Sequence, residues 1–185
     1  LHSLPLRVLG GESDIEYRVR PLLENADPTA AIYCKTGECE IRITARAATD
    51  AEGQEKCRAY AKKFYNILGD AVYDEDVAGL EETVVRTLKE KGLTIAAAES
   101  CTGGLIAQRL TAVPGSSEVF GYGFVTYWAE AKTRLVGVDP AVIDRYNVVS
   151  APVAAQMAAG TLEASGADIA LSVTGIAGPT GGDEV

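Results

Sequence analysis

The sequence feature that most constrains the fold is an apolar run at residues 93–98, Leu-Thr-Ile-Ala-Ala-Ala. Such a run without polar alternation is typical of a strand that is buried on both faces, as in a parallel sheet covered by helices. Further strand-like segments at 122–127 and 168–173 alternate with stretches of helical periodicity. This alternation predicts an α/β domain, a three-layer α/β/α arrangement with a largely parallel sheet.

The helices of this domain are expected to cover both faces of the sheet. Val77, Leu80, Val84 and Leu88 recur at helical spacing, and Gly92 is the expected stop. Further helices are predicted through residues 105–110, near 131–135 and over 152–165. The chain stops in a glycine-rich segment, so we expect further strands of this sheet to lie outside the sequence.

The first 73 or so residues predict a separate, small α+β unit. A helix is expected to start at residues 12–14 and to end at 25–28. Two strands at 30–34 and 40–45 follow, joined by a hairpin turn, and then a helix that is capped at Thr49 and runs to Leu68. A short strand at 71–73 completes the order α-β-β-α-β. The acidic segment 74–76 is interpreted as an exposed connector, which gives domains at 1–75 and 76–185.

Charge and composition exclude several classes of function. The net charge of −9 disfavours a protein that binds nucleic-acid backbones, and no apolar run is long enough to span a membrane. No export signal is recognisable at the N-terminus, so the chain is expected in the cytoplasm, with its four cysteines reduced and mostly structural. The single histidine, His2, leaves no basis for a Ser-His-Asp triad, and we expect neither a metal site nor a cofactor.

The segment 98–104, Ala-Glu-Ser-Cys-Thr-Gly-Gly, places the Ser100 hydroxyl where a buried strand is expected to turn into a helix. A helix N-terminus offers free N–H groups that can hold a phosphate or an oxyanion. Ser100 is therefore a candidate nucleophile, and the Gly103-Gly104 turn a candidate anion cradle. The alternative is that Ser100 and Thr102 only cap the helix.

Lys132 is the candidate base, because a serine nucleophile needs one and histidine is excluded. A lysine can act in this way only if burial or neighbouring cations lower its pKa. Lys132 follows an apolar strand end and precedes Leu135 and Val136, so partial burial is expected, although Glu130 would oppose the shift if it faced the same way. The alternative is a solvated helix lysine.

A second strand end opens into a glycine-rich loop at residues 172–182. Two neighbouring strand ends in an open sheet form the usual ligand crevice, so Thr174 and the glycines after it are expected to contact a ligand. The alternative is a flexible loop. No Gly-Lys-Ser/Thr follows, so this is not a Walker motif.

These segments together resemble the C-terminal domain of the CinA family of competence/damage-inducible proteins, a nicotinamide-nucleotide amidase domain. The matching pieces are residues 98–104, Tyr127 with 130–132, 134–138 and 172–179. Residues 6–73, with the motifs at 10–16 and 33–38, are similar to the KH-like middle domain of CinA. The resemblance to the amidase domain covers residues near 78 to 185.

The resemblance implies a metal-free amidohydrolase that converts nicotinamide mononucleotide to nicotinic acid mononucleotide and ammonia. By motif position, Ser100 would attack the carboxamide carbon and Lys132 would take the hydroxyl proton. The residues expected to contact or support the substrate are Glu99, Thr102, Gly103, Gly104, Tyr127, Thr174, Gly175 and Gly178. The partners expected are a small-molecule nucleotide and further copies of the chain, in a dimer or other homo-oligomer, with no membrane and no nucleic acid.

The chain departs from the family pattern in places. Trp128-Ala129 stands where the family pattern has small or polar residues such as Ser-Asn. No part of the chain matches the family's C-terminal strands and helix, and none matches its N-terminal molybdopterin-binding-like domain. The alternative function is a non-catalytic, KH-type binding or oligomerisation module. Against RNA binding stand the net charge and the lack of a Gly-x-x-Gly loop with basic flanks.

Overall fold

The computed structural model describes residues 1–35 and 37–178. By the contacts within the chain, it divides into two compact units, Leu1–Thr83 and Val84–Val185. In the described residues, no helix is long and apolar enough to cross a membrane.

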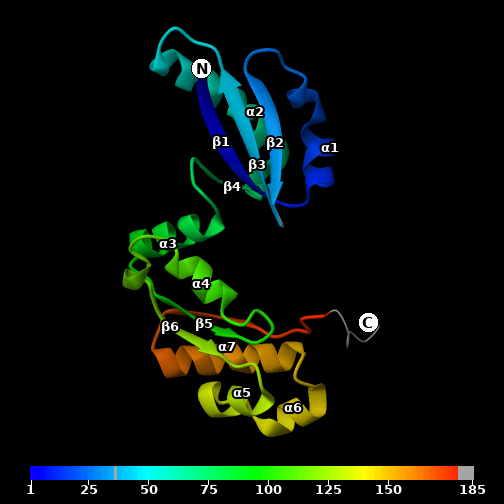
Figure 1. Ribbon diagram of the computed structural model, residues 1–185, viewed down its shortest axis with the longest axis vertical. Coiled ribbons are helices and arrows are strands. Elements are labelled where there is room, and N and C mark those ends of the chain that lie inside the picture. Colours follow the sequence, from blue (N-terminus) through cyan, green and yellow to red (C-terminus); the bar gives the residue numbers. More distant parts are fainter. Residues whose placement is uncertain (36, 179–185) are drawn as a thin grey trace. The chain divides into compact units, whose positions relative to one another are not determined.

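The first unit is a four-stranded antiparallel sheet with two helices (Figure 1). The sheet order is β2-β3-β1-β4, and α1 and α2 pack on one face of it, around a core that includes Leu6, Ile41 and Phe64. The elements in chain order are β1 (His2–Leu9), α1 (Glu12–Leu23), β2 (Thr29–Lys35), β3 (Glu38–Ala45), α2 (Asp50–Leu68), a 3₁₀ turn (Gly69–Ala71) and β4 (Val72–Glu75).

Strand β1 was not predicted from the sequence, although it is one of the two central strands of this sheet. It pairs with β3 along its whole length and with β4 on its other side. Its alternation is regular, because Leu4, Leu6 and Val8 are buried in the core. Pro5 obscures the pattern, since proline lacks the N–H that a strand interior normally uses. The order is therefore β-α-β-β-α-β.

Of the predicted exposed connector 74–76, only Asp76 is exposed and lies outside the strand. Asp74 and Glu75 belong to β4 and are only partly exposed, opposite Arg7 and Leu6 of β1. The chain continues against the sheet, because the buried Arg7 guanidinium donates hydrogen bonds to the carbonyl oxygens of Val77 and Ala78, at 2.8 and 2.7 Å. Arg7 also lies 3.3 Å from the Glu40 carboxylate.

The second unit has the predicted alternation of helices and parallel strands. Its elements are β5 (Ile95–Glu99), α4 (Leu105–Thr111), a 3₁₀ turn (Ser116–Glu118), β6 (Phe120–Val125), α5 (Ala129–Val136), α6 (Pro140–Tyr146), α7 (Ala151–Ser165) and β7 (Ile169–Val173). Helix α3 (Leu80–Lys91) precedes them, and the division between the units falls within it. Helix α3 starts at Leu80 rather than at Val77, and α6 was not predicted.

The sheet of this unit has the order β6-β5-β7, with β5 parallel to both neighbours. Helix α7 lies on one side of the sheet, with α5 and α6 packed on it, and α4 lies on the other side (Figure 1). Two separate apolar clusters fill these layers, one around Val136 and Met157 and one around Val85 and Leu110. The three-layer α/β/α prediction is confirmed, and the fully buried alanines 96–98 explain the apolar run that predicted it.

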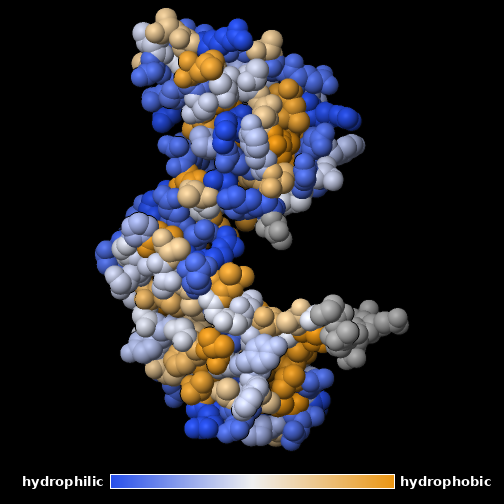
Figure 2. Space-filling model, viewed as in Figure 1, coloured by the Kyte–Doolittle hydropathy of each residue, from blue (hydrophilic) through white to orange (hydrophobic). Residues whose placement is uncertain are grey.

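A close approach between α5 and α7 depends on glycine. A Cβ at Gly160 of α7 would collide with the carbonyl group of Val136, the last residue of α5. Because Lys132 lies one turn earlier on α5, this contact fixes the distance of the candidate base from the sheet. Elsewhere on this unit apolar side chains reach the surface, as the orange areas in Figure 2 show; among the exposed residues are Val125, Leu135 and Leu171.

Candidate active site

The carboxyl ends of the three parallel strands meet at one edge of the sheet. The pairing continues one residue past β5, because the Ser100 N–H donates to the Val173 carbonyl at 2.9 Å and the Thr126 N–H donates to the Glu99 carbonyl at 2.8 Å. The strand ends therefore place Ser100, Thr126 and the start of the Thr174 loop side by side. Open parallel sheets bind their ligands at this edge.

Lys132 of α5 reaches this edge from the helix layer. Its side chain is 1% exposed, and Nζ lies 2.9 Å from the buried Ser100 Oγ. The same Nζ lies 2.7 Å from the Thr126 carbonyl oxygen and 3.5 Å from that of Tyr127. Lys132 is thus a buried lysine in contact with the candidate nucleophile, and not the solvated helix lysine of the alternative.

Burial lowers the pKa of Lys132 below its ordinary value, and the nearby Cys101 opposes this only in part. The contacts of Nζ explain the direction, because the three oxygens around it are neutral and none belongs to a carboxylate. Glu130, which could have stabilised the ammonium form, instead pairs with Arg134 on the exposed side of α5, at 3.2 Å. A larger fraction of Lys132 is therefore neutral than for a lysine in water.

Glu99 ends β5 with a carboxylate that is directed at the N-terminus of α4. It accepts hydrogen bonds from the N–H groups of Gly104, Ile106 and Ala107, at 3.1, 3.0 and 2.8 Å. Burial by itself would raise the pKa of this carboxyl group, but the neighbouring Thr102 hydroxyl and these three donors outweigh it, so the pKa is lowered. Glu99 thus holds the turn that carries Ser100.

The turn between Ser100 and α4 leaves a particular set of N–H groups available. Gly103 donates to the Ser100 carbonyl, and Gly104 to Glu99, so the N–H groups of both predicted cradle glycines are occupied. Among the described residues, no acceptor is found for the N–H groups of Cys101 and Thr102. Both glycines have positive φ, at 59° and 106°, which explains why the turn needs glycine at these positions.

The other residues predicted to contact the substrate are Tyr127, Thr174, Gly175 and Gly178. The Tyr127 ring is exposed, and only its carbonyl group faces Lys132. The Thr174 hydroxyl donates to the Val148 carbonyl at 2.8 Å, so it attaches its loop to the segment between α6 and α7. A Cβ at Gly175 would lie 2.9 Å from Cys101 Sγ, which places this loop against the Ser100 turn. Gly178 is exposed, and the part of the loop at 179–182 lies outside the described residues.

Thr126 is a site residue that sequence reasoning missed. It is fully buried, and its carbonyl oxygen is the acceptor nearest to Lys132 Nζ. The available signal was a threonine at the end of an apolar strand, six residues before the lysine. As for metals, the described residues contain no cluster of three or more His, Cys, Asp or Glu side chains that could hold an ion.

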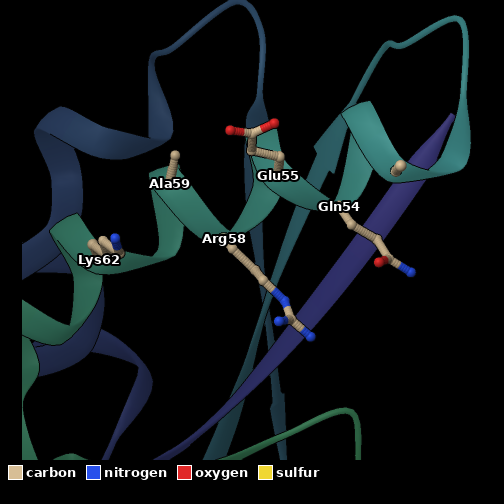
Figure 3. A pocket seen from close by; sticks show the side chains of 6 residues that line it. Gln54, Glu55, Arg58, Ala59 and Lys62 are labelled. Atoms are coloured by element: carbon tan, nitrogen blue, oxygen red, sulfur yellow. The ribbon is translucent and has the colours of Figure 1, made fainter.

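A hollow of about 400 Å³ on the first unit does not compete with this site. It lies along α2 and is lined by Ala51, Gln54, Glu55, Arg58, Ala59 and Lys62. Figure 3 shows the Glu55 and Arg58 side chains pointing away from one another, so the charged groups do not converge on a ligand position.

Comparison with known proteins gives the family of this site. The family model described as "CinA C-terminal domain" matches residues 77–185, and the one described as "Damage-inducible protein CinA KH domain" matches residues 5–73. The chain belongs to the CinA family. The four-stranded antiparallel sheet is therefore in the CinA KH region, and the Ser100–Lys132 pair is in the CinA C-terminal region.

Relatives from several bacteria match along almost the whole chain. A CinA-like protein of Desulfovibrio desulfuricans is 46% identical over 187 residues, which cover 98% of this chain and 43% of the relative. A CinA-like protein of Dictyoglomus thermophilum is 46% identical over 184 residues, which cover 98% of this chain and 45% of the relative. The chain thus spans less than half the length of these CinA relatives.

Two crystal structures are similar to part of the chain. A CinA superfamily protein from Escherichia coli matches with a TM-score of 0.54 and 38% identity, over 56% of this chain and 60% of that one. A competence/damage-inducible protein from Agrobacterium tumefaciens matches with a TM-score of 0.53 and 43% identity, over 56% of this chain and 62% of that one.

Proposed function

We propose that the CinA C-terminal region of this chain is an amidohydrolase that deamidates nicotinamide mononucleotide, with Ser100 as the nucleophile and Lys132 as the general base. The observation that carries the proposal is the 2.9 Å separation of Lys132 Nζ and Ser100 Oγ, both buried. The choice of substrate rests on the family: the chain belongs to the CinA family, and the resemblance to the C-terminal domain of that family implies this activity.

The contacts of Lys132 favour the neutral amine as the working form. A neutral amine has two N–H donors and one lone pair, and two backbone carbonyl oxygens lie within reach, those of Thr126 and Tyr127. If these accept the two N–H groups, the lone pair is left for the Ser100 hydroxyl proton. Burial lowers the pKa of Lys132 in the direction that this role requires.

The reaction then proceeds in two steps. Ser100 Oγ attacks the carboxamide carbon while Lys132 takes its proton; the tetrahedral intermediate collapses, Lys132 returns the proton to the leaving nitrogen, and ammonia departs. Water, deprotonated by the same amine, cleaves the acyl-enzyme ester to nicotinic acid mononucleotide and restores the Ser100 hydroxyl. One water is consumed and one ammonia is released per turnover, and no redox step occurs.

The oxyanion of both intermediates needs hydrogen-bond donors close to Ser100. The N–H groups of Cys101 and Thr102 directly follow the nucleophile and have no acceptor among the described residues. We assign them this role in place of the predicted cradle glycines, whose N–H groups are occupied. The exposed rings of Tyr127 and Trp128, next to Thr126, are available to stack on a planar pyridine ring.

The test is release of ammonia from nicotinamide mononucleotide by the purified protein. Ser100→Ala and Lys132→Ala are expected to lower kcat by on the order of 10³-fold or more. Lys132→Arg keeps a cation at this position but cannot act as a base, so it is expected to be equally inactive. Arg134→Gln, on the exposed side of the same helix, is the matched control and should keep full activity.

Two outcomes would contradict the proposal in different ways. Activity that survives in Lys132→Arg would show that a cation, and not a base, is needed at this position. A wild-type protein that hydrolyses other carboxamides but not nicotinamide mononucleotide would disprove the substrate and leave the Ser100–Lys132 mechanism in place.

A further inference from the structure

Two cysteines of the KH region face each other across the β2–β3 hairpin. Cys34 of β2 and Cys39 of β3 are directly opposed in the strand register, and their Sγ atoms lie 2.7 Å apart. Both thiols are free. The Cα atoms of opposed residues in an antiparallel pair are about 4.5–5.5 Å apart, which lies within the range that disulfides span. The backbone therefore already has a geometry that a disulfide needs.

The two thiols differ in their access to solvent. Cys34 is exposed, whereas Cys39 is 1% exposed and directs its Sγ toward the Gly10 carbonyl oxygen, at 3.7 Å. The Gly10 N–H in turn donates to the Gly37 carbonyl at 3.2 Å, so the hairpin is attached to the end of β1. One thiol can thus meet a reagent in solution, while the other is held beside it in a fixed position.

We propose that Cys34 and Cys39 form a reversible dithiol–disulfide site that exchanges with small-molecule disulfides. In the first step the Cys34 thiolate attacks a sulfur of the small disulfide RSSR, forms a mixed disulfide and releases one RS⁻. In the second step the Cys39 thiolate attacks Cys34 Sγ, forms the Cys34–Cys39 bond and releases the second RS⁻. The protein loses two thiol protons and two electrons, and the small disulfide is reduced to two thiols.

The environment of the two sulfurs fits this order of events. Burial raises the pKa of the Cys39 thiol to about 12, and the neighbouring Cys34 contributes to the rise. Cys39 is therefore the weaker nucleophile toward a reagent in solution, and Cys34 reacts first. Once Cys34 is bonded to R, its thiolate charge is gone, and the position of Cys39 within contact distance compensates for its basicity, because the second step is intramolecular.

The other two cysteines serve as internal comparisons. Cys57 is fully buried, and its Sγ is directed at the carbonyl groups of His2 and Ile43. Cys101 lies beside Ser100 in the second unit, and among the described residues no other sulfur is paired with it. Neither has a neighbouring thiol that could complete an exchange, so neither is expected to form an intramolecular disulfide.

The test uses the sequence around the hairpin. Purified protein is incubated with excess oxidised glutathione, quenched with N-ethylmaleimide and digested with trypsin. Cleavage after Lys35 separates the two cysteines, which then lie in peptides 19–35 and 36–42, since Arg20 precedes a proline. We expect these two peptides to be joined, with a mass two hydrogens below their sum, and to be released by dithiothreitol. The undigested protein should migrate as a monomer without reductant.

Two variants make the experiment decisive. Cys34→Ser should remove the joined peptides and leave Cys39 as a free thiol. Cys39→Ser should stop the reaction at the first step, with at least tenfold more glutathione on Cys34 than in the wild type. The proposal is overturned if wild-type Cys34 stays glutathionylated or alkylated beside an alkylated Cys39, or if the joined peptides come only from disulfide-linked dimers.

Discussion

The Lys132 amine lies 2.7 Å from the Thr126 carbonyl oxygen while it contacts Ser100 Oγ at 2.9 Å. The carbonyl belongs to the first residue after β6 and is fixed by the sheet, because the Thr126 N–H is bonded to Glu99 at 2.8 Å. The position of the base is therefore determined by the backbone of the sheet edge.

The rate of amide hydrolysis should depend on pH through Lys132. Only the neutral amine accepts the Ser100 proton, so kcat/KM should fall as pH drops below the pKa of Lys132. Burial lowers this pKa, so the fall should begin below 10.5, the ordinary value for a lysine. A pH profile of kcat/KM measures it, and a rate that rises on acidification would contradict the assignment of Lys132 as base.

The stability of the second unit should also depend on pH through Lys132. The lowered pKa means that the unfolded chain binds more protons than the folded one between the two pKa values, so the folded state gains stability as pH rises through this range. In Lys132→Met this dependence is absent. The difference in unfolding free energy between the variant and the wild type should therefore shift in favour of the wild type between neutral pH and about pH 10. Urea denaturation at several pH values checks it, and a constant difference would show that burial does not perturb Lys132.

Glu99→Gln should destabilise the turn that carries Ser100. Glutamine replaces one acceptor oxygen by an NH₂ group that faces N–H donors, so at least one of the three bonds to α4 is lost, at a cost of about 1–3 kcal/mol. The pKa of Glu99 is lowered on folding, so its contribution is present above the unfolded value and is lost as pH falls through the folded one. Urea denaturation at pH 7 and at acidic pH measures both effects.

The control for this variant is Glu130→Gln, which removes an exposed i,i+4 ion pair with Arg134. Its cost should be no more than about 0.5 kcal/mol. Equal effects of the two substitutions would mean that the buried carboxylate does not hold the turn.

Gly160→Ala should separate α7 from α5 and disturb the site at a distance. The added Cβ meets the Val136 carbonyl group, a backbone contact that no side-chain rotation relieves. We expect a loss of about 2 kcal/mol in stability. We also expect lower kcat, because Lys132 lies on α5. Thermal unfolding and ammonia release measure the two effects.

The matched control is Gly121→Ala in β6, where a Cβ would have nothing within 4 Å. It should change stability by less than about 0.5 kcal/mol. If Gly160→Ala proved equally neutral, the two helices would not depend on this close approach.

Local sequence patterns determined most of the elements of this chain. Thr49 caps α2 as predicted, because a threonine followed three residues later by a glutamate supplies the hydrogen bonds that a helix start needs. The apolar run at 93–98 predicted a doubly covered strand, since only such a strand can bury both faces. Strand β1 was missed because Pro5 interrupts an otherwise regular alternation. Helix α6 was missed because it has only seven residues and none of them is buried, so it shows no apolar periodicity.

Only the tertiary structure decided which partners the polar groups have. Ser100, Lys132 and Glu99 were recognised in the sequence, but the direction of each side chain depends on which strand ends lie side by side. That arrangement turned Glu99 toward the N-terminus of α4 and Lys132 toward Ser100 and Thr126. Periodicity encodes which face of an element is buried. It does not encode which atoms meet there, because those contacts join distant residues: Lys132 and Ser100 are 32 positions apart in the chain.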